Sequence, residues 1–334
     1  MFSDRKDDYK KIEKLRNSKL LVFVTGDRPG LETQIHPEVL DYFVDHLDNF
    51  NLPQKITLFL YTRGGSTSAS WSIVNLIQQF CEEFEVIIPS KAHSGGTLLS
   101  LGAKNIIMTK QATLGPIDPS VNTPLNPQVP GAPPQSKVPV SVEAINGFID
   151  LAKNEFSLKG QKELVNILES LSEKVHPLVL GEVVRARTQI KMLAERLLSR
   201  QIKDKKVIEK IIKFLVSDSG SHDYTINRRE ARDELGLNIE NPNDELYKLI
   251  KKLYDNMRQE LLLNEKLDLH SLLGTNTQVN YSFRRALIES IDFGTNVFLS
   301  NGTLVKQSVV GPNNVQQVGI NDQRTFEGWR YERP

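Results

Sequence analysis

The chain has 334 residues, and its 42 Lys and Arg against 41 Asp and Glu give a formal net charge of +1. A hydrophobic content of 39% and a charged content of 25% are typical of globular proteins and exclude an intrinsically disordered chain. The near-zero charge argues against a nucleic-acid partner, which needs a concentrated basic surface. The single cysteine, Cys81, excludes internal disulfides and a cysteine-based zinc cluster.

No membrane or export segment is expected. The apolar run at residues 20–24 is far too short to cross a bilayer. The first eight residues carry both charge signs, whereas a signal peptide is basic and then apolar. The sequence therefore predicts a cytoplasmic protein with no integral membrane segment.

Residues 19–110 alternate between short apolar runs and amphipathic helical patterns, which is typical of repeated β-α-β units. Such units imply parallel strands joined by right-handed crossovers. This part of the chain is therefore predicted to be α/β. The expected strands are 20–25, 55–61, 85–89 and 105–109, and the expected helices begin near residues 37, 68 and 95.

Beyond this region the composition changes. Residues 119–139 are rich in Pro, Asn, Gln and Gly and predict an irregular exposed loop. Helices are then expected, one capped by Ser141 and a longer one over 243–263. Near the end, the pair Asn301 and Gly302 between two β-type runs predicts a hairpin turn. We divide the chain into a charged N-terminal segment (1–18), a catalytic core (19–160), a helical extension (161–265) and a C-terminal β-containing segment (266–334).

Two glycine pairs follow predicted strands. In residues 62–65 (TRGG), consecutive glycines can leave backbone N–H groups free of side chains. Such groups are the donors from which an oxyanion hole is built. The alternative is a tight turn that only needs positive φ, and a single glycine pair would favour that alternative.

The second pair lies in residues 91–97 (KAHSGGT), between a predicted strand and a helix. Ser94 is expected at the strand-to-helix turn, where the helix dipole favours developing negative charge. A lone serine there is more often a helix cap than a nucleophile, but the two glycine pairs together favour the nucleophile. The sequence contains no G-x-G-x-x-G, no G-x-x-x-x-G-K-[ST] and no H-E-x-x-H, so neither a nucleotide nor a metal site is predicted.

Residues 61–65 (YTRGG), 91–97 (KAHSGGT) and 114–119 (LGPIDP) resemble the serine dehydrogenase proteinase family. That family is similar to signal peptide peptidase A and belongs to the Clp-protease/crotonase superfamily. Residues 24–32 and 221–231 extend the resemblance, which covers roughly residues 19–310. It implies a repeated ββα core with a helical extension and a small C-terminal β element. It also implies an ATP-independent serine endopeptidase that acts on peptide or protein substrates through an acyl-enzyme, without a cofactor, as a homo-oligomer.

The resemblance also implies roles for single residues. Ser94 matches the nucleophile, Gly64 and Gly65 match the oxyanion turn, and the N–H of Gly95 would be the second donor. Two other functions stay open on the same residues. An acyl-CoA hydratase or isomerase would recruit Arg63 and the Asp118 carboxylate, and a non-catalytic scaffold would keep the serine as a cap.

The general base has more than one candidate in this sequence. Clp-type peptidases place a histidine where this chain has residues 116–119 (PIDP), and no histidine is there. Signal-peptide-peptidase relatives use a lysine after a variable loop, and Lys137 is the nearest equivalent. Asp118, His93 and His222 remain alternatives.

Overall fold

The computed structural model describes residues 1–117, 119–158, 160–219, 221, 223–310 and 316–333. The chain forms two compact units. The first joins Met1–Leu114 to Asn227–Pro334, and the second is Gly115–Ile226. Across the described ranges, no helix has both the length and the apolar character needed to cross a membrane. The predicted α/β class is confirmed, whereas the four-segment division of the chain stays a prediction.

The first unit contains the expected alternation of strands and helices, followed by a long antiparallel segment. Its first part comprises α1 (Phe2–Arg16), β1 (Lys19–Thr25), α2 (Val39–Leu47), β2 (Lys55–Tyr61), α3 (Thr67–Phe80), β3 (Glu83–Ile88), β4 (Lys91–Ala92), α4 (Gly95–Leu101), β5 (Asn105–Met108) and β6 (Thr113–Leu114). Strand β9 (Ile226–Asn227) spans the boundary between the two units in the sequence. The first unit then continues with the π-helix η3 (Glu230–Glu234; η marks π-helices), β10 (Ile239–Glu240), α9 (Asp244–Leu261), α10 (Leu269–Leu273), β11 (Gln278–Ser290), β12 (Gly294–Val310) and β13 (Gln316–Glu332).

One sheet of strand order β10-β5-β3-β2-β1-β11-β12-β13 organises this unit. The strands from β10 to β1 run parallel to one another, and β11, β12 and β13 continue the sheet antiparallel. Strands β1 and β2 are almost continuously apolar and are buried over their last six residues. Parallel strands covered on both faces require that composition, so the apolar runs in the sequence were the right signal.

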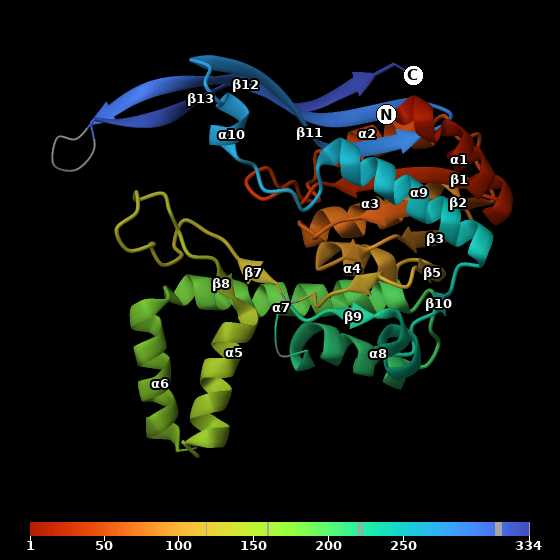
Figure 1. Ribbon diagram of the computed structural model, residues 1–334. Helices are drawn as coiled ribbons and strands as arrows, with labels where there is room; N and C mark the ends of the chain where they lie inside the picture. Colours follow the sequence, from red (N-terminus) through yellow and green to blue (C-terminus); the bar gives the residue numbers. More distant parts are fainter. Residues whose placement is uncertain (118, 159, 220, 222, 311–315, 334) are drawn as a thin grey trace. The chain divides into compact units, whose positions relative to one another are not determined.

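Helices cover both faces of the sheet. Alternate β1 residues, including Leu20 and Val22, belong to a core cluster with side chains of α1 and α9, which lie side by side in Figure 1. On the opposite face, Phe23 packs edge-on against Phe43 of α2, with 5.2 Å between ring centroids. The two-residue periodicity of a strand thus divides the core into two layers.

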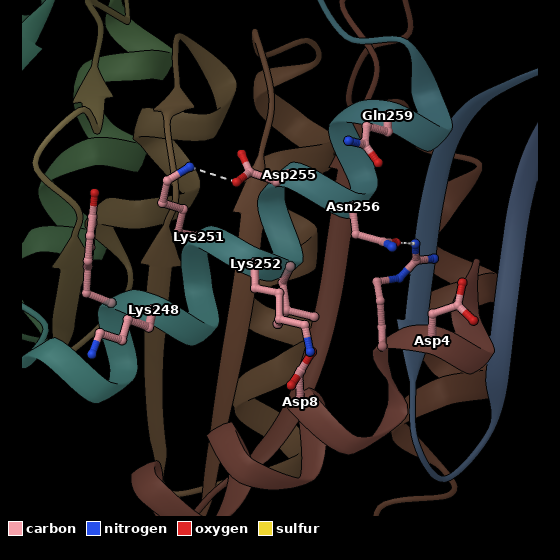
Figure 2. A pocket seen from close by; sticks show the side chains of 11 residues that line it. Asp4, Asp8, Lys248, Lys251, Lys252, Asp255, Asn256 and Gln259 are labelled. Carbon is pink, nitrogen blue, oxygen red and sulfur yellow. Dashed lines mark hydrogen bonds and ion pairs between the residues drawn. The ribbon is translucent and has the colours of Figure 1, made fainter.

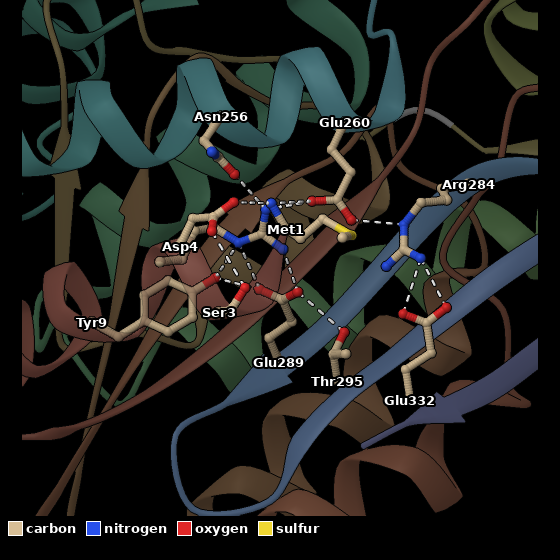
Figure 3. Close-up of polar contacts among 11 residues, drawn as sticks. Met1, Ser3, Asp4, Tyr9, Asn256, Glu260, Arg284, Glu289, Thr295 and Glu332 are labelled. Atoms are coloured by element: carbon tan, nitrogen blue, oxygen red, sulfur yellow. Dashed lines mark hydrogen bonds and ion pairs between the residues drawn. The ribbon is translucent and has the colours of Figure 1, made fainter. Parts of the chain in front are cut away.

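Helix α1 was expected only as a charged segment, but it is a structural element. Arg5 is 1% exposed and contacts Glu289 of β11 through Nε and Nη2, at 3.1 and 2.5 Å. Tyr9 also bonds Glu289, and Arg5 Nη1 lies 2.5 Å from Glu260 of α9 (Figure 3). The buried charges are therefore paired, as burial in a low-dielectric interior demands.

The predicted hairpin turn at Asn301 and Gly302 is wrong. Both residues lie inside β12, which is continuous from Gly294 to Val310, where the pairing with β13 shifts register. A Cβ on Gly302 would lie 2.5 Å from the hydroxyl oxygen of Tyr281, so the glycine serves a close approach rather than a turn. The C-terminal β element is also larger than predicted, and Figure 1 shows β12 and β13 running together as a long ribbon.

The second unit is mainly helical. Its elements are β7 (Ser120–Val121), β8 (Val140–Ser141), α5 (Val142–Asp150), η1 (Leu151–Glu155), α6 (Gln161–Lys174), α7 (Pro177–Leu198), α8 (Lys205–Lys213) and η2 (Phe214–Asp218). Ser141 caps α5 as predicted, accepting a hydrogen bond from the Ala144 amide at 3.2 Å. A small valine-rich cluster, which includes Val121, Val140 and Val179, packs together β7, β8 and the start of α7.

Candidate active site

Ser94 occupies the turn between β4 and α4, as the sequence predicts. Its φ of 49° and ψ of −115° lie in a region that non-glycine residues rarely adopt. The Ser94 side chain makes no capping bond to α4, and Ser94 Oγ has no hydrogen-bond partner among the described residues. The alternative in which Ser94 serves as a side-chain cap is therefore not what the geometry shows.

The first glycine turn lies directly against this serine. Gly64 and Gly65 follow β2 with φ of +111° and +142°. A Cβ on Gly64 would lie 2.7 Å from the Cβ of Ser94, and one on Gly95 would lie 3.0 Å from the carbonyl oxygen of Gly65. Any side chain at Gly64 would therefore collide with Ser94. The two motifs, about thirty residues apart in the sequence, form one site.

The backbone donors of this site differ in availability. The Gly64 N–H donates to Thr62 Oγ1 at 2.9 Å, so this amide is already used. Within the described part of the chain, the N–H groups of Gly65 and Gly95 donate to no protein acceptor. Gly95 is the first residue of α4, whose leading amides lack intrahelical acceptors and lie at the positive end of the helix dipole. Gly65 and Gly95 therefore offer the two amides that can receive an oxyanion.

The candidate bases are distributed over the chain. His93 lies in the first unit, and its Nε2 is 2.9 Å from the hydroxyl oxygen of Thr113. Lys137 lies in the second unit, partly buried in the segment that pairs with Gln128. Asp118 and His222 lie outside the described residues. Among the described residues, therefore, no contact to Ser94 assigns the base.

An acidic residue that sequence analysis did not single out lies at the carboxyl ends of β1 and β2. Asp27 is 4% exposed, and its Oδ2 accepts from Tyr61 at 2.8 Å and from Lys91 Nζ at 2.7 Å. Burial, and then the Asp27 charge, raise the pKa of the Tyr61 hydroxyl well above its usual range. Asp27 lies within residues 24–32, a segment that contributes to the family resemblance. Its ion pair with Lys91 connects the loop after β1 to β4, the strand that precedes Ser94.

A separate pocket of about 430 Å³ lies between α1 and α9 (Figure 2). Its walls carry ion pairs of 2.7 Å between Lys252 and Asp8 and between Lys251 and Asp255. None of the predicted site residues lines it. Over the described ranges, no group of three or more His, Cys, Asp or Glu side chains is arranged to hold a metal ion.

Comparison with known proteins identifies the segment that contains the site. Residues 51–133 match the model of the ClpP-like SDH-type serine proteinases. This match includes both glycine turns and Ser94, and it confirms the family resemblance that the motifs indicate.

Two curated relatives come from Methanocaldococcus jannaschii. The uncharacterized protein MJ0137 is 29% identical over 206 residues, which are 61% of this chain and 60% of that protein. The uncharacterized protein MJ1495 is 30% identical over 203 residues, which are 59% of this chain and 56% of that protein. The chain thus spans less than two thirds of the length of either relative.

Solved structures also show a distant likeness. A variant of the 1510-N membrane-bound stomatin-specific protease is 14% identical with a TM-score of 0.39, over 76% of this chain and 90% of that one. ClpP1 from Listeria monocytogenes is 16% identical with a TM-score of 0.37, over 70% of this chain and 98% of that one. The family resemblance of this chain rests on the sequence match over residues 51–133.

Proposed function

We propose that this chain, whose residues 51–133 match the model of the ClpP-like SDH-type serine proteinases, is a serine endopeptidase of the serine dehydrogenase proteinase type. Ser94 is its nucleophile, and the amides of Gly65 and Gly95 are its oxyanion donors. Gly64 contributes the absence of a side chain beside Ser94, because its own amide is bonded to Thr62.

One observation carries this proposal: the positive φ of Ser94 without a capping bond. A non-glycine residue in such a conformation costs about 1–3 kcal/mol and persists only where the surrounding structure enforces it. Here the Gly96 amide donates to the His93 carbonyl at 2.8 Å, and the Leu98 amide donates to the Ser94 carbonyl at 3.0 Å. The strained turn brings Ser94 against Gly64 and directly before Gly95, and the Gly65 and Gly95 amides donate to no acceptor in the described part of the chain, which supports Ser94 as the nucleophile.

The reaction follows from these positions. Ser94 Oγ attacks the scissile carbonyl carbon as the base removes its proton, and the carbonyl oxygen becomes an oxyanion that accepts from Gly65 and Gly95. Collapse of the tetrahedral intermediate breaks the C–N bond, and the protonated base gives its proton to the leaving amine. Water then hydrolyses the acyl-serine ester by the same steps.

Lys137 is the base we favour, with His93, Asp118 and His222 as the alternatives. A lysine accepts a proton only in its neutral form, which burial in a closed site favours. His93 already lies against Thr113, and that contact makes it less suited to reach Ser94. The resemblance to relatives that use a lysine after a variable loop supports the choice of Lys137.

The remaining features of the proposal come from the same resemblance. The substrate is an extended peptide or protein, the enzyme works without ATP or a cofactor, and copies of the chain assemble into a homo-oligomer. We place it in the cytoplasm. Size-exclusion chromatography with light scattering and a nucleotide-free peptidase assay test assembly and ATP independence.

Labelling with a fluorophosphonate probe tests the nucleophile. We expect the probe to modify the wild type on Ser94 and to leave Ser94→Ala unlabelled, with hydrolysis of a casein substrate lost by orders of magnitude. Ser141→Ala is the matched control, because it removes a real helix cap and costs about 1 kcal/mol of stability while leaving labelling intact. Labelling of Ser94→Ala equal to the wild type would exclude the nucleophile.

The base is tested by combining variants. Lys137→Ala should lose activity as fully as Ser94→Ala, and the double variant should be no worse, because catalytic partners act as a unit. Lys137→Arg should not rescue, since a guanidinium stays protonated. Wild-type rates in Lys137→Ala, with loss in His93→Ala, Asp118→Asn or His222→Ala, would move the base to that residue.

A further inference from the structure

Thr62 lies between β2 and the first glycine turn. Its side chain is fully buried and forms hydrogen bonds with Gly64 and with Thr25. Its Oγ1 accepts the N–H of Gly64 at 2.9 Å and the hydroxyl of Thr25 at 2.7 Å. Thr62 Oγ1 also lies 3.4 Å from the Gly64 carbonyl oxygen. The Thr62 hydroxyl therefore contacts both the N–H and the carbonyl oxygen of Gly64.

The other end of the same residue contacts the second turn. A Cβ on Gly96 would lie 2.4 Å from Thr62 Cγ2. The threonine methyl therefore occupies the space that a side chain at position 96 would need. The Thr62 amide donates to the Lys91 carbonyl and the His93 amide donates to the Thr62 carbonyl, both at 3.1 Å. Thr62 is thus held against residues on both sides of Ser94, namely Lys91 and His93 before it and Gly96 after it.

We propose that Thr62 is the positioning residue of the oxyanion hole, which sets the Gly65 amide in register with the Gly95 amide. This inference rests on the proposed function. A bond from Gly64 N–H to the hydroxyl fixes the plane of the peptide before Gly64 and constrains the unusual φ of the two glycines that follow. In that conformation the Gly65 N–H donates to no acceptor among the described residues, and its nitrogen would lie 3.2 Å from a Cβ on Gly95.

The hydroxyl and the methyl of Thr62 can be separated by substitution. Thr62→Val keeps a methyl against Gly96 and removes the acceptor for Gly64, whereas Thr62→Ser keeps the acceptor and removes the methyl. Thr57→Val is the matched control, because Thr57 is equally buried in β2 and its Oγ1 donates to Glu85 at 2.7 Å, in the part of the strand away from the turn.

The experiment measures kcat and KM for a chromogenic peptide, together with inhibition by a peptide aldehyde that forms a tetrahedral adduct. Loss of one oxyanion donor lowers kcat about 10²–10³-fold, so a displaced donor is expected to lower it about 10–100-fold in Thr62→Val. KM should stay within about twofold, and aldehyde inhibition should weaken in parallel with kcat. Thr62→Ser and Thr57→Val should stay within about threefold of the wild type in kcat.

An unchanged kcat in Thr62→Val, or an equal loss in Thr62→Ser, would show that Thr62 acts by packing and would overturn the proposal. Should Thr62→Val fail to fold, Thr62→Ser decides alone: a loss above about tenfold overturns the assignment, and near-wild-type kinetics support it.

Amide hydrogen exchange separates this inference from the proposed function. The Gly64 amide should be protected in the wild type and in Thr62→Ser and should exchange at least about tenfold faster in Thr62→Val. If Ser94→Ala retains full hydrolysis, the proposed function has failed, and with it the catalytic part of the role. The exchange result then decides whether the hydroxyl holds the turn, and an unprotected Gly64 amide in the wild type overturns that as well.

Discussion

At the scale of single residues, burial sets the chemistry of several polar groups, and His46 of α2 is the clearest case. Its ring is fully buried, with Nδ1 2.7 Å from Ser290 Oγ and Nε2 3.0 Å from Asn296 Oδ1. Burial lowers the pKa of His46 to about 4, although the bond to Asn296 works in the other direction. The imidazole is therefore neutral in the folded protein at neutral pH.

This burial predicts an acid-sensitive stability. Between pH 6.5 and about 4 the unfolded chain binds a proton at His46 that the folded chain does not, so the free energy of unfolding falls as the pH falls. The loss should reach roughly 3 kcal/mol at the acidic end. Urea unfolding of the wild type and of His46→Gln at pH 7 and pH 4.5 measures it.

The histidine substitutions need a control for other titrating groups. His36→Gln is the matched control, because it removes a histidine whose side chain is 64% exposed rather than buried. The same slope of unfolding free energy against pH in His46→Gln and in the wild type would contradict the assignment.

At the scale of an element, helix α1 shows how a charged sequence can hide a core element. Its buried positions include Phe2, Arg5, Tyr9 and Ile12, which share a helical face, but the arginine interrupts the apolar pattern. The partners of that arginine, Glu260 and Glu289, lie more than 250 residues away. The helix is thus held by a buried ion-pair network whose members are remote in the sequence.

We expect Arg5→Leu to destabilise the first unit by roughly 3–5 kcal/mol, because it leaves the buried Glu289 without a counter-charge. The double variant Arg5→Leu with Glu289→Leu should recover most of that loss, since an apolar pair can replace a buried ion pair. Chemical unfolding of the single and double variants measures both effects.

An exposed cation on the same helix is the control. Lys10 is 63% exposed and lies 3.7 Å from Asp7, so Lys10→Leu should change the unfolding free energy by less than about 0.5 kcal/mol. Arg5→Leu within the same range would show that the network contributes nothing to stability.

At the scale of the whole molecule, the first unit is built from both ends of the chain. Strand β1 pairs with β11, where Val22 lies opposite Glu289, and β5 pairs with β10, where Ile106 lies opposite Ile239. The intervening Gly115–Ile226 segment forms its own compact unit. The first unit therefore needs residues after 226 to complete its sheet.

We expect a chain in which residues 116–225 are replaced by a flexible Gly/Ser linker to keep the first unit folded but to lose hydrolysis, because the proposed base, Lys137, is removed. Circular dichroism with thermal unfolding and the peptidase assay measure the two outcomes. Full activity of the linker variant would exclude Lys137 as the base.

A chain truncated after residue 226 should fail to fold, since β11 and α9 are missing.

The sequence by itself determined the features that depend on local pattern. The apolar runs at 20–25 and 55–61 predicted strands that the structure has, and the two glycine pairs marked turns that come together at Ser94. These predictions succeed because strand burial and positive φ are properties of a few neighbouring residues. They also carried the family resemblance, which the match over residues 51–133 confirms.

Only the tertiary structure decided the features that depend on distant partners. Asn301 and Gly302 have the chemistry of a turn, yet pairing with β11 and β13 keeps them in a strand, where Tyr281 occupies the space beside the glycine. Arg5 is buried because Glu289 meets it from the other end of the chain. The Gly64 amide is unavailable to a substrate because Thr62 accepts it in the folded turn. These features depend on contacts between residues that meet only in the folded chain, and a short window of sequence does not show those contacts.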